Sequence, residues 1–237
     1  MRKPLRTAMT CVAYLVAIPA VITLGAVLWR GERYHLVSLL VALLACLPFF
    51  ALFEKGRSSA RELVTLSVMT ALSVVGRLIF TPIPAFKPVS ALVIITGIAF
   101  GPVAGFVTGS RSAIVSNIFF GQGPWTPFQM LVWGLVGFVS GIIFKRGRKP
   151  HPVALVAVGV LGGIFYSVGM DVWTALSGEG GFSWAGYLAY ATAALPMTVS
   201  YAVSNVVFLL LLTGPLLQKT ERLRVKYGIF GGEKNGI

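Results

Sequence analysis

Apolar runs long enough to cross a bilayer occupy most of this chain, and they constrain its fold more than any other feature. Of its 237 residues, 56% are hydrophobic and only 11% are charged. About 20 apolar residues span a bilayer as a helix, whose backbone polar groups are hydrogen-bonded internally. The sequence therefore predicts an all-α integral membrane protein with short loops and no separate soluble domain. The runs cover roughly residues 8–29, 36–53, 62–81, 89–119, 127–144, 152–175 and 186–214.

The positive charge of the chain gathers beside these runs. The formal net charge is +13, and basic residues cluster near the N-terminus and at residues 55–61, 145–149 and 219–226. Lys and Arg next to apolar spans mark cytoplasmic ends, where they also meet anionic lipid. This placement argues against nucleic-acid binding, although the net charge alone would permit it. It also predicts that both termini are cytoplasmic and that the protein lies in the plasma membrane.

The basic clusters and the apolar runs together predict eight membrane spans. If all four clusters are cytoplasmic, an even number of spans must separate each pair. Three runs lie between residues 61 and 145, so the run 89–119 must contain two passes. Gly101-Pro102 is the expected break, because proline removes a backbone donor and glycine permits a turn. The first half, residues 89–100, is expected to be a short or tilted helix inside the bundle.

A change in composition divides the chain into an added helix pair and a functional core. Residues 1–53 are rich in Leu, Val and Ala, whereas small residues, prolines and polar side chains become frequent from residue 62 onward. We therefore expect an N-terminal transmembrane pair at 1–53, a cytoplasmic linker at 54–61, a six-helix core at 62–215 and a basic cytoplasmic tail at 216–237.

Small residues within the core indicate close helix packing. Gly105-x3-Gly109 and Gly137-x3-Gly141 are small-x3-small motifs in apolar surroundings. Ser67 and the residues after it give the first core span a face of small side chains. Packing within the bundle and docking of another membrane subunit both remain open for these positions.

Catalysis and ion pumping find little support in the sequence. Asp171 is the only carboxylate inside a core span, so no acid–base pair exists there. His35 and His151 are expected in loops on opposite sides, Cys11 and Cys46 form no metal motif, and the chain has no phosphate-binding loop. Arg77 and Arg111 lie within spans, where a charge should face a partner or a polar cavity.

Three outer loops carry the residues best suited to hold a ligand. They are residues 82–88, 121–127 and 176–185, and aromatic and polar side chains lie at the adjacent span ends. The stretch from Asn117 to Trp133 contains no charged residue, although a turn in water would usually carry some. Aromatic faces with a few amides suit a planar metabolite with polar edges. An interfacial aromatic belt is the alternative explanation.

Two sequence segments in the core carry a resemblance to a known family. One is Gly76-Arg-Leu-Ile-Phe followed by Ile-Pro-Ala-Phe-Lys-Pro-Val-Ser-Ala, which continues to Gly-Pro-Val-Ala-Gly105. The other is Val115-Ser-Asn-Ile-Phe-Phe-Gly-Gln-Gly-Pro-Trp-Thr-Pro-Phe-Gln-Met130. Over about residues 60–215 the chain resembles the substrate-binding S components of energy-coupling factor (ECF) vitamin transporters. The resemblance implies a six-helix core that binds a vitamin tightly from outside. It also implies association with a transmembrane coupling subunit and two cytoplasmic ATPases.

The resemblance carries over to individual residues. It places contacts with the coupling subunit at Ser67 and Ala71, and it implies no metal, cofactor or catalytic residue. Among S components, the chain looks most like those linked to cobalamin or its precursors. The pair 1–53 and the charge at Arg111 depart from the family pattern. The ligand contacts that the resemblance implies are Phe86, Lys87, Asn117, Gln122, Trp125, Gln129, Tyr166, Asp171 and Asn205.

Two other classes of function remain as alternatives. A stand-alone secondary carrier would couple uptake to an ion and would need Asp171 or Arg111. A membrane enzyme or assembly factor would need a catalytic constellation that we do not find in the sequence. The leading hypothesis is the high-affinity substrate-capture subunit of an ATP-driven vitamin importer.

Overall fold

The described part of the chain is helical throughout. The computed structural model describes residues 59–144, 150–178 and 182–231, together with residues 40, 43, 44, 46, 47 and 50. Five of its helices are long and apolar enough to cross a membrane, and α5 is a shorter apolar helix. The predicted all-α membrane bundle is therefore confirmed. The elements are α4 (Ala60–Ile79), α5 (Val89–Phe100), α6 (Pro102–Phe120), α7 (Thr126–Ile143), α8 (Pro152–Ser177), α9 (Trp184–Ala193), α10 (Leu195–Tyr227) and the 3-10 turn η2 (Ile229–Gly231).

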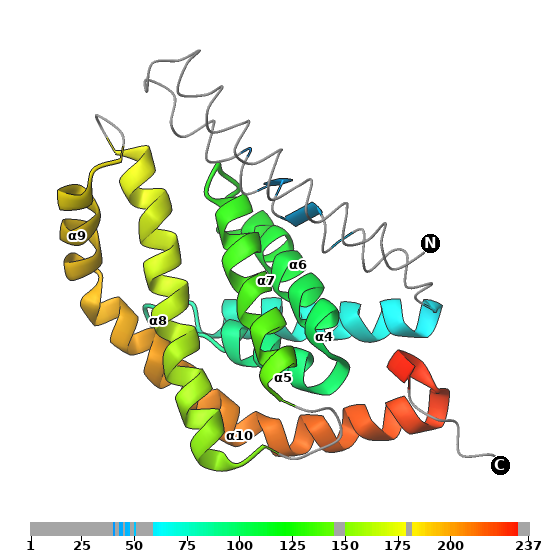
Figure 1. Ribbon diagram of the computed structural model, residues 1–237. Coiled ribbons are helices and arrows are strands. Elements are labelled where there is room, and N and C mark those ends of the chain that lie inside the picture. Colours follow the sequence, from blue (N-terminus) through cyan, green and yellow to red (C-terminus); the bar gives the residue numbers. More distant parts are fainter. Residues whose placement is uncertain are drawn as a thin grey trace.

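The helices form a bundle in which α5 is the innermost element. In Figure 1, α6, α7 and α8 run alongside one another, while α4 and α10 cross them. Helix α5 contacts α4, α6, α7, α8 and α10, and every one of its 12 residues is buried. A helix that is apolar on all sides must lie inside the protein or in lipid. Here α5 is enclosed by protein, as the sequence led us to expect.

The backbone breaks between α5 and α6 at the Gly-Pro pair. Gly101 has φ 98°, a conformation that glycine adopts without steric cost, and Pro102 is the first residue of α6. Proline at this position loses no hydrogen bond, because the first backbone donors of a helix have no partner within it. The predicted division of the run 89–119 into two helices is thus observed at the expected residue.

Close backbone contacts between α5, α6 and α7 explain the small-residue motifs. A Cβ atom built on Gly105 would lie 2.4 Å from the carbonyl oxygen of Gly137, and one on Gly109 would lie 2.4 Å from that of Trp133. A Cβ on Gly141 would lie 2.5 Å from the nitrogen of Pro102. Both motifs therefore serve packing within the bundle.

Substitution of Gly105 tests this packing. We expect Gly105→Ala to lower the free energy of unfolding by about 1–3 kcal/mol, because the added methyl forces two backbones apart. Gly214→Ala is the matched control, since a Cβ at Gly214 meets nothing within 4 Å. The control should be neutral or up to about 1 kcal/mol more stable, as alanine favours a helix over glycine. Thermal unfolding midpoints in detergent measure both variants, and equal midpoints would contradict the close contact.

The segment that follows the predicted core meets the start of α4. The backbone N–H of Phe230 donates to the Glu62 carboxylate at 2.5 Å, and the Arg61 guanidinium lies 5.1 Å from the centre of the Tyr227 ring. Helix α10 continues past residue 215 into the first half of the predicted tail. These contacts hold η2 and the last residue of α10 against the start of α4 (Figure 1).

The predicted helix pair 1–53 lies mostly outside the described residues. Of its described positions, Cys46 is 2% exposed, and the Phe50 ring meets Phe106 of α6 edge-on, with 6.1 Å between ring centres. These two residues therefore pack against the core. The division into pair, linker, core and tail stays a prediction.

Candidate functional site

A line of hydrogen-bonded polar side chains joins four helices. Arg77 ends α4, Asn117 lies in the last turn of α6, and Gln129 lies in the first turn of α7. Tyr166 comes from the middle of α8. Because α6 and α7 are neighbours joined by a short turn, the end of one and the start of the other lie together. We call Arg77, Asn117, Gln129 and Tyr166 the polar chain.

The hydrogen bonds of the polar chain are all side chain to side chain. Arg77 Nη1 donates to Asn117 Oδ1 at 2.8 Å and also to the Ser116 hydroxyl. Asn117 Nδ2 donates to Gln129 Oε1 at 2.8 Å, and Gln129 Nε2 donates to the Tyr166 hydroxyl at 3.0 Å. Asn117, Gln129 and Tyr166 are buried. Buried polar groups without partners are costly, so this connected line stabilises its own members.

Aromatic rings flank the polar chain. Trp133 stacks on Tyr166 with ring centres 4.9 Å apart and planes 9° apart, and Tyr201 of α10 meets Tyr166 edge-on at 4.9 Å. The Arg77 guanidinium lies 4.3 Å from the centre of the Phe120 ring and 5.2 Å from that of Trp133. The buried Trp133 Nε1 has no hydrogen-bond partner among the described residues. It is a donor that a ligand could satisfy.

The loop between α4 and α5 is fixed against α10. The hydroxyl of Ser204 donates to the Lys87 carbonyl at 2.9 Å, and that of Ser200 donates to the Pro84 carbonyl at 3.0 Å. The buried Ala85 has φ 58°, which is uncommon for a residue with a Cβ. Contacts with α10 therefore hold this loop, including the left-handed backbone of Ala85, next to the polar chain.

Two predicted ligand contacts belong to this loop. Phe86 packs between Phe80 and Phe208, at 5.9 and 5.3 Å between ring centres. Lys87 Nζ lies 6.0 Å from the centre of the Phe120 ring, the same ring that Arg77 approaches. Burial, and secondarily the charge of Arg77, lower the pKa of the Lys87 ammonium. Lys87 therefore borders the charged end of the polar chain, whereas Phe86 belongs to an apolar cluster.

Gln122 and Trp125 lie in the turn between α6 and α7. Gln122 Nε2 donates to the Ile114 carbonyl at 2.7 Å, and Gln122 Oε1 accepts from the Thr126 hydroxyl at 3.1 Å. Thr126 in turn accepts from Asn117 Nδ2 at 2.9 Å, which connects the turn to the polar chain. Trp125 is 37% exposed, so its ring is available at the rim of the site.

Among the described residues, Asp171 and Asn205 form no hydrogen bond with the polar chain. Asp171 lines a groove of about 580 Å³ between α8 and the α9–α10 segment, whose walls are otherwise almost entirely apolar, and its Oδ2 atom has no described hydrogen-bond partner. Asn205 Nδ2 donates to the Gly159 carbonyl at 3.1 Å and so joins α10 to α8. The role of both residues in ligand binding stays a prediction.

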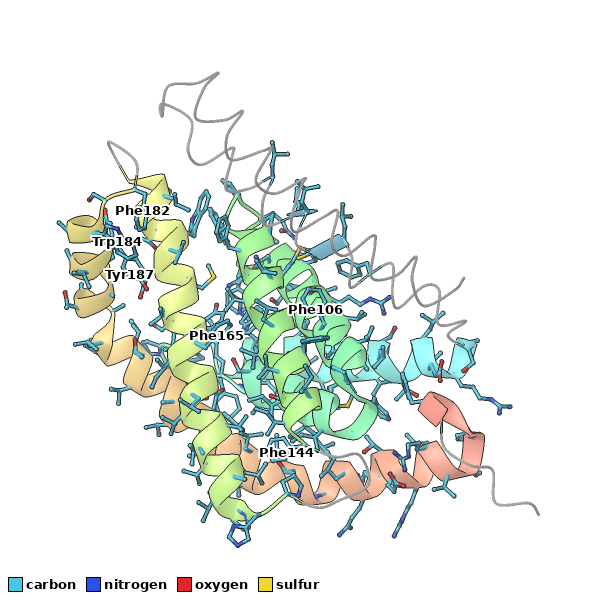
Figure 2. The ribbon with its side chains drawn as sticks, in the orientation of Figure 1. Phe106, Phe144, Phe165, Phe182, Trp184 and Tyr187 are labelled. Carbon is cyan, nitrogen blue, oxygen red and sulfur yellow. The ribbon has the colours of Figure 1, made fainter. Side chains whose placement is uncertain are left out.

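A separate aromatic group lies in the loop before α9 and in the first turn of α9. Figure 2 shows Phe182, Trp184 and Tyr187 close together at this end of the molecule. Ring centres lie 5.2 Å apart for Phe182 and Trp184 and 6.1 Å apart for Trp184 and Tyr187. Trp184 is 71% exposed, which suits an aromatic belt at the membrane interface. For this loop, an aromatic belt at the membrane interface explains the exposed rings as well as ligand binding does.

Sequence reasoning left out several residues of the site. The sequence marks Arg77 as a charge within a span and Trp133 as the end of the uncharged stretch, but it assigns neither residue to the ligand. For Arg77, the charge inside an apolar span was the sequence signal that pointed to a polar partner or cavity. Tyr201 gave no signal, because its register relative to Tyr166 depends on how α10 crosses α8. Arg111 is half-buried on α6. Among the described residues, no group of three metal-binding side chains was found.

The predicted docking residues lie on an exposed face of α4. Ser67 and Ala71 are exposed, and the Ser67 hydroxyl donates to the Leu63 carbonyl of its own helix. Val64 and Val68 on the same side are 62% and 53% exposed. A groove of about 710 Å³ between α4 and the C-terminal part of α10 borders this face. Helix α4 therefore presents small and apolar side chains outward along much of its length.

Comparison with known families gives one match. A family described as "ECF-type riboflavin transporter, S component" matches residues 57–222. No significant match to a curated protein or to a solved structure was found. The matched segment covers more than half of the chain and contains the whole polar chain and the α4 face.

Proposed function

Since the chain belongs to the ECF-type riboflavin transporter S component family, we propose that it is the high-affinity capture subunit of an ATP-driven importer, and that its ligand is riboflavin or a related flavin. The observation that carries the proposal is the polar chain with its flanking rings. A flavin is a flat ring system with polar edges, and the stacked rings of Trp133 and Tyr166 lie beside the amides of Asn117 and Gln129. Binding sites for small molecules combine apolar surface with a few placed polar groups in this way.

The family description directs the proposal to a flavin and away from the cobalamin type. Cobalamin or a cobalamin precursor stays a prediction that no contact described above supports. The matched segment begins at residue 57, so residues 1–56 lie outside the family pattern. We take residues 62–215 as the binding unit and the N-terminal pair as an addition to it.

The proposed partners are a transmembrane coupling subunit and two cytoplasmic ATPases. The chain has no phosphate-binding loop, so the energy of ATP must reach it through other subunits. We propose that the coupling subunit docks on the face of α4 around Ser67 and Ala71. Small side chains there would allow two helix backbones to approach closely.

One observation favours the stand-alone carrier as a second candidate. The Asp171 carboxylate lies in an apolar groove with one oxygen unpaired among the described residues, as ion-coupling carboxylates often do. Proteoliposomes separate the two candidates. The capture subunit should show uptake only with the coupling subunit, the ATPases and ATP, whereas a carrier should show uptake alone under an ion gradient.

The first test is identification of the bound molecule. Protein purified from cells grown in vitamin-rich medium should release a flavin on denaturation, at a ratio near one per chain, detected by mass spectrometry. Tight binding keeps the ligand through purification, because each tenfold gain in affinity adds about 1.4 kcal/mol. Recovery of a different vitamin would retain the importer and replace the flavin. Loss of every small molecule, together with gradient-driven uptake by the chain alone, would contradict the proposal.

A further inference from the structure

Arg77, at one end of the polar chain, and the neighbouring Lys87 are two cations that a neutral vitamin would not engage by charge. We propose that the captured ligand carries an anionic group, a phosphate or a carboxylate, which Arg77 and Lys87 bind together. This inference rests on the proposed function, because it concerns the ligand of the same site. It adds a substrate class, since riboflavin itself carries no such group.

Two cations approach one aromatic ring at this end of the site. The guanidinium carbon of Arg77 lies 4.3 Å from the centre of Phe120, and Lys87 Nζ lies 6.0 Å from it. Both side chains are only partly exposed. The face of an aromatic ring attracts a cation but does not neutralise its charge. The positive charge of Arg77 contributes to the lowered pKa of Lys87, so the two like charges repel each other, and an anion bound beside both would relieve this repulsion.

The described hydrogen-bond partners of Arg77 are neutral. Its guanidinium donates to the Ser116 hydroxyl and to Asn117 Oδ1 at 2.8 Å. Among the residues that the structure describes, the ion pair is that of Arg224 with Glu221 at 3.0 Å, near the far end of α10. The positive charge of Arg77 is therefore held in position by hydrogen bonds but is not balanced by them.

None of the described carboxylates forms an ion pair with Arg77 or Lys87. Glu62 caps the start of α4, and its side chain also accepts from the backbone of Phe230. It precedes Arg77 by 15 helical residues, a rise of roughly 22 Å. Asp171 lines the groove between α8 and the α9–α10 segment and forms no ion pair within the described part of the chain. An anion supplied by the ligand is thus the counter-charge that fits this end.

Aromatic, amide and cationic side chains lie together in this part of the site. Trp133 stacks on Tyr166, the amides of Gln129 and Asn117 bond to each other, and the Arg77 guanidinium lies 5.2 Å from the centre of the Trp133 ring. Phosphate is bound well by arginine, whose planar fork of donors fits its oxygens. A flavin with a phosphate could engage all three parts, whereas riboflavin could engage only the first two.

A matched ligand pair tests the inference. Full-length protein in a maltoside detergent, which contains no phosphate, is titrated with riboflavin and with riboflavin 5′-phosphate by quenching of flavin fluorescence. We expect the phosphate ester to bind at least about tenfold more tightly, because charge-assisted hydrogen bonds are roughly twice as strong as neutral ones.

Four variants assign that preference to the cations. Arg77→Gln removes the charge, and Asn117→Asp supplies Arg77 with an internal carboxylate, so both should reduce the affinity ratio to about one by different routes. Arg77→Lys keeps the charge and should keep part of the ratio. Arg222→Gln removes one exposed charge from the distant part of α10 and should keep all of it.

The outcomes separate this inference from the proposed function. Equal affinities, or tighter binding of riboflavin, would overturn the inference and leave the proposed function intact. Failure of both flavins to bind would overturn both. A lipid headgroup could supply the same phosphate chemistry. Equal flavin affinities, together with co-purified phospholipid that is lost in Arg77→Gln, would identify lipid as the anion and overturn the inference.

Discussion

Ala71→Trp should abolish ATP-driven uptake by the assembled transporter while the isolated chain still binds its ligand. Ala71 lies on the outward face of α4, between the exposed side chains of Val64, Val68 and Val75. An indole at this position would hold a partner helix away from the backbone of α4. Helix association in membranes depends on such close approach, because lipid tails provide no hydrophobic drive for it. We expect uptake to fall at least about 10-fold, since the loss of even a few contacts of this type costs over 1.4 kcal/mol.

A control at an equally exposed alanine separates docking from general effects of bulk. Ala157 lies on the outward side of α8, and Ala157→Trp adds the same indole to a different helix. Uptake into proteoliposomes and co-purification of the coupling subunit should be lost in the first variant and kept in the second. If Ala71→Trp still binds the partner and transports at the normal rate, the docking face lies elsewhere.

The break at Gly101 shows how much of the fold could be predicted from the sequence. The run 89–119 is long enough for more than one helix, and Gly-Pro is a strong local signal that needs no tertiary information. The complete burial of α5 followed from its length and from the absence of any polar side. Local chemistry and the count of spans were therefore sufficient for α4 to α8 and their order, whereas the single predicted run 186–214 is divided in the structure into α9 and α10, and α10 continues to Tyr227.

The two buried asparagines show where such reasoning stops. Asn117 and Asn205 are both amides within apolar helices, and both were expected to contact the ligand. In the structure, Asn117 joins the polar chain, whereas Asn205 donates to the Gly159 backbone and holds α10 against α8. Which amide meets which neighbour depends on helix crossing and rotation, and these are set by packing across the whole bundle. The same reason explains why Tyr201 could not be assigned in advance.

Gln129→Leu should weaken ligand binding by about 10–100-fold, because Gln129 is the link between the two halves of the polar chain. Its Oε1 accepts from Asn117 at 2.8 Å, and its Nε2 donates to the Tyr166 hydroxyl at 3.0 Å. Leucine has a similar size but offers neither group. One Asn117 N–H and the Tyr166 hydroxyl would then be buried without partners, at about 1–3 kcal/mol each. Tyr166 would also lose the bond that orients it under Trp133.

A matched substitution on the same helix isolates the role of Gln129. Ser140 is also buried on α7, but its hydroxyl donates only to the Val136 carbonyl of the same helix at 2.7 Å. Ser140→Ala should leave ligand affinity within about twofold, because no other helix depends on that hydroxyl. Equal losses of ligand affinity in the two variants would show that removing any buried polar group from α7 weakens binding, and that Gln129 has no specific role.

The bond to Tyr166 can be tested further by combining substitutions. If Gln129 acts through Tyr166, then Gln129→Leu should cost less affinity in a Tyr166→Phe background than in the parent chain, because residues in direct contact are not additive. Flavin fluorescence titrations of the parent, the two single variants and the double variant give this coupling. Additive losses would mean that Gln129 and Tyr166 contact the ligand independently, and that the hydrogen bond between them belongs only to the ligand-free state.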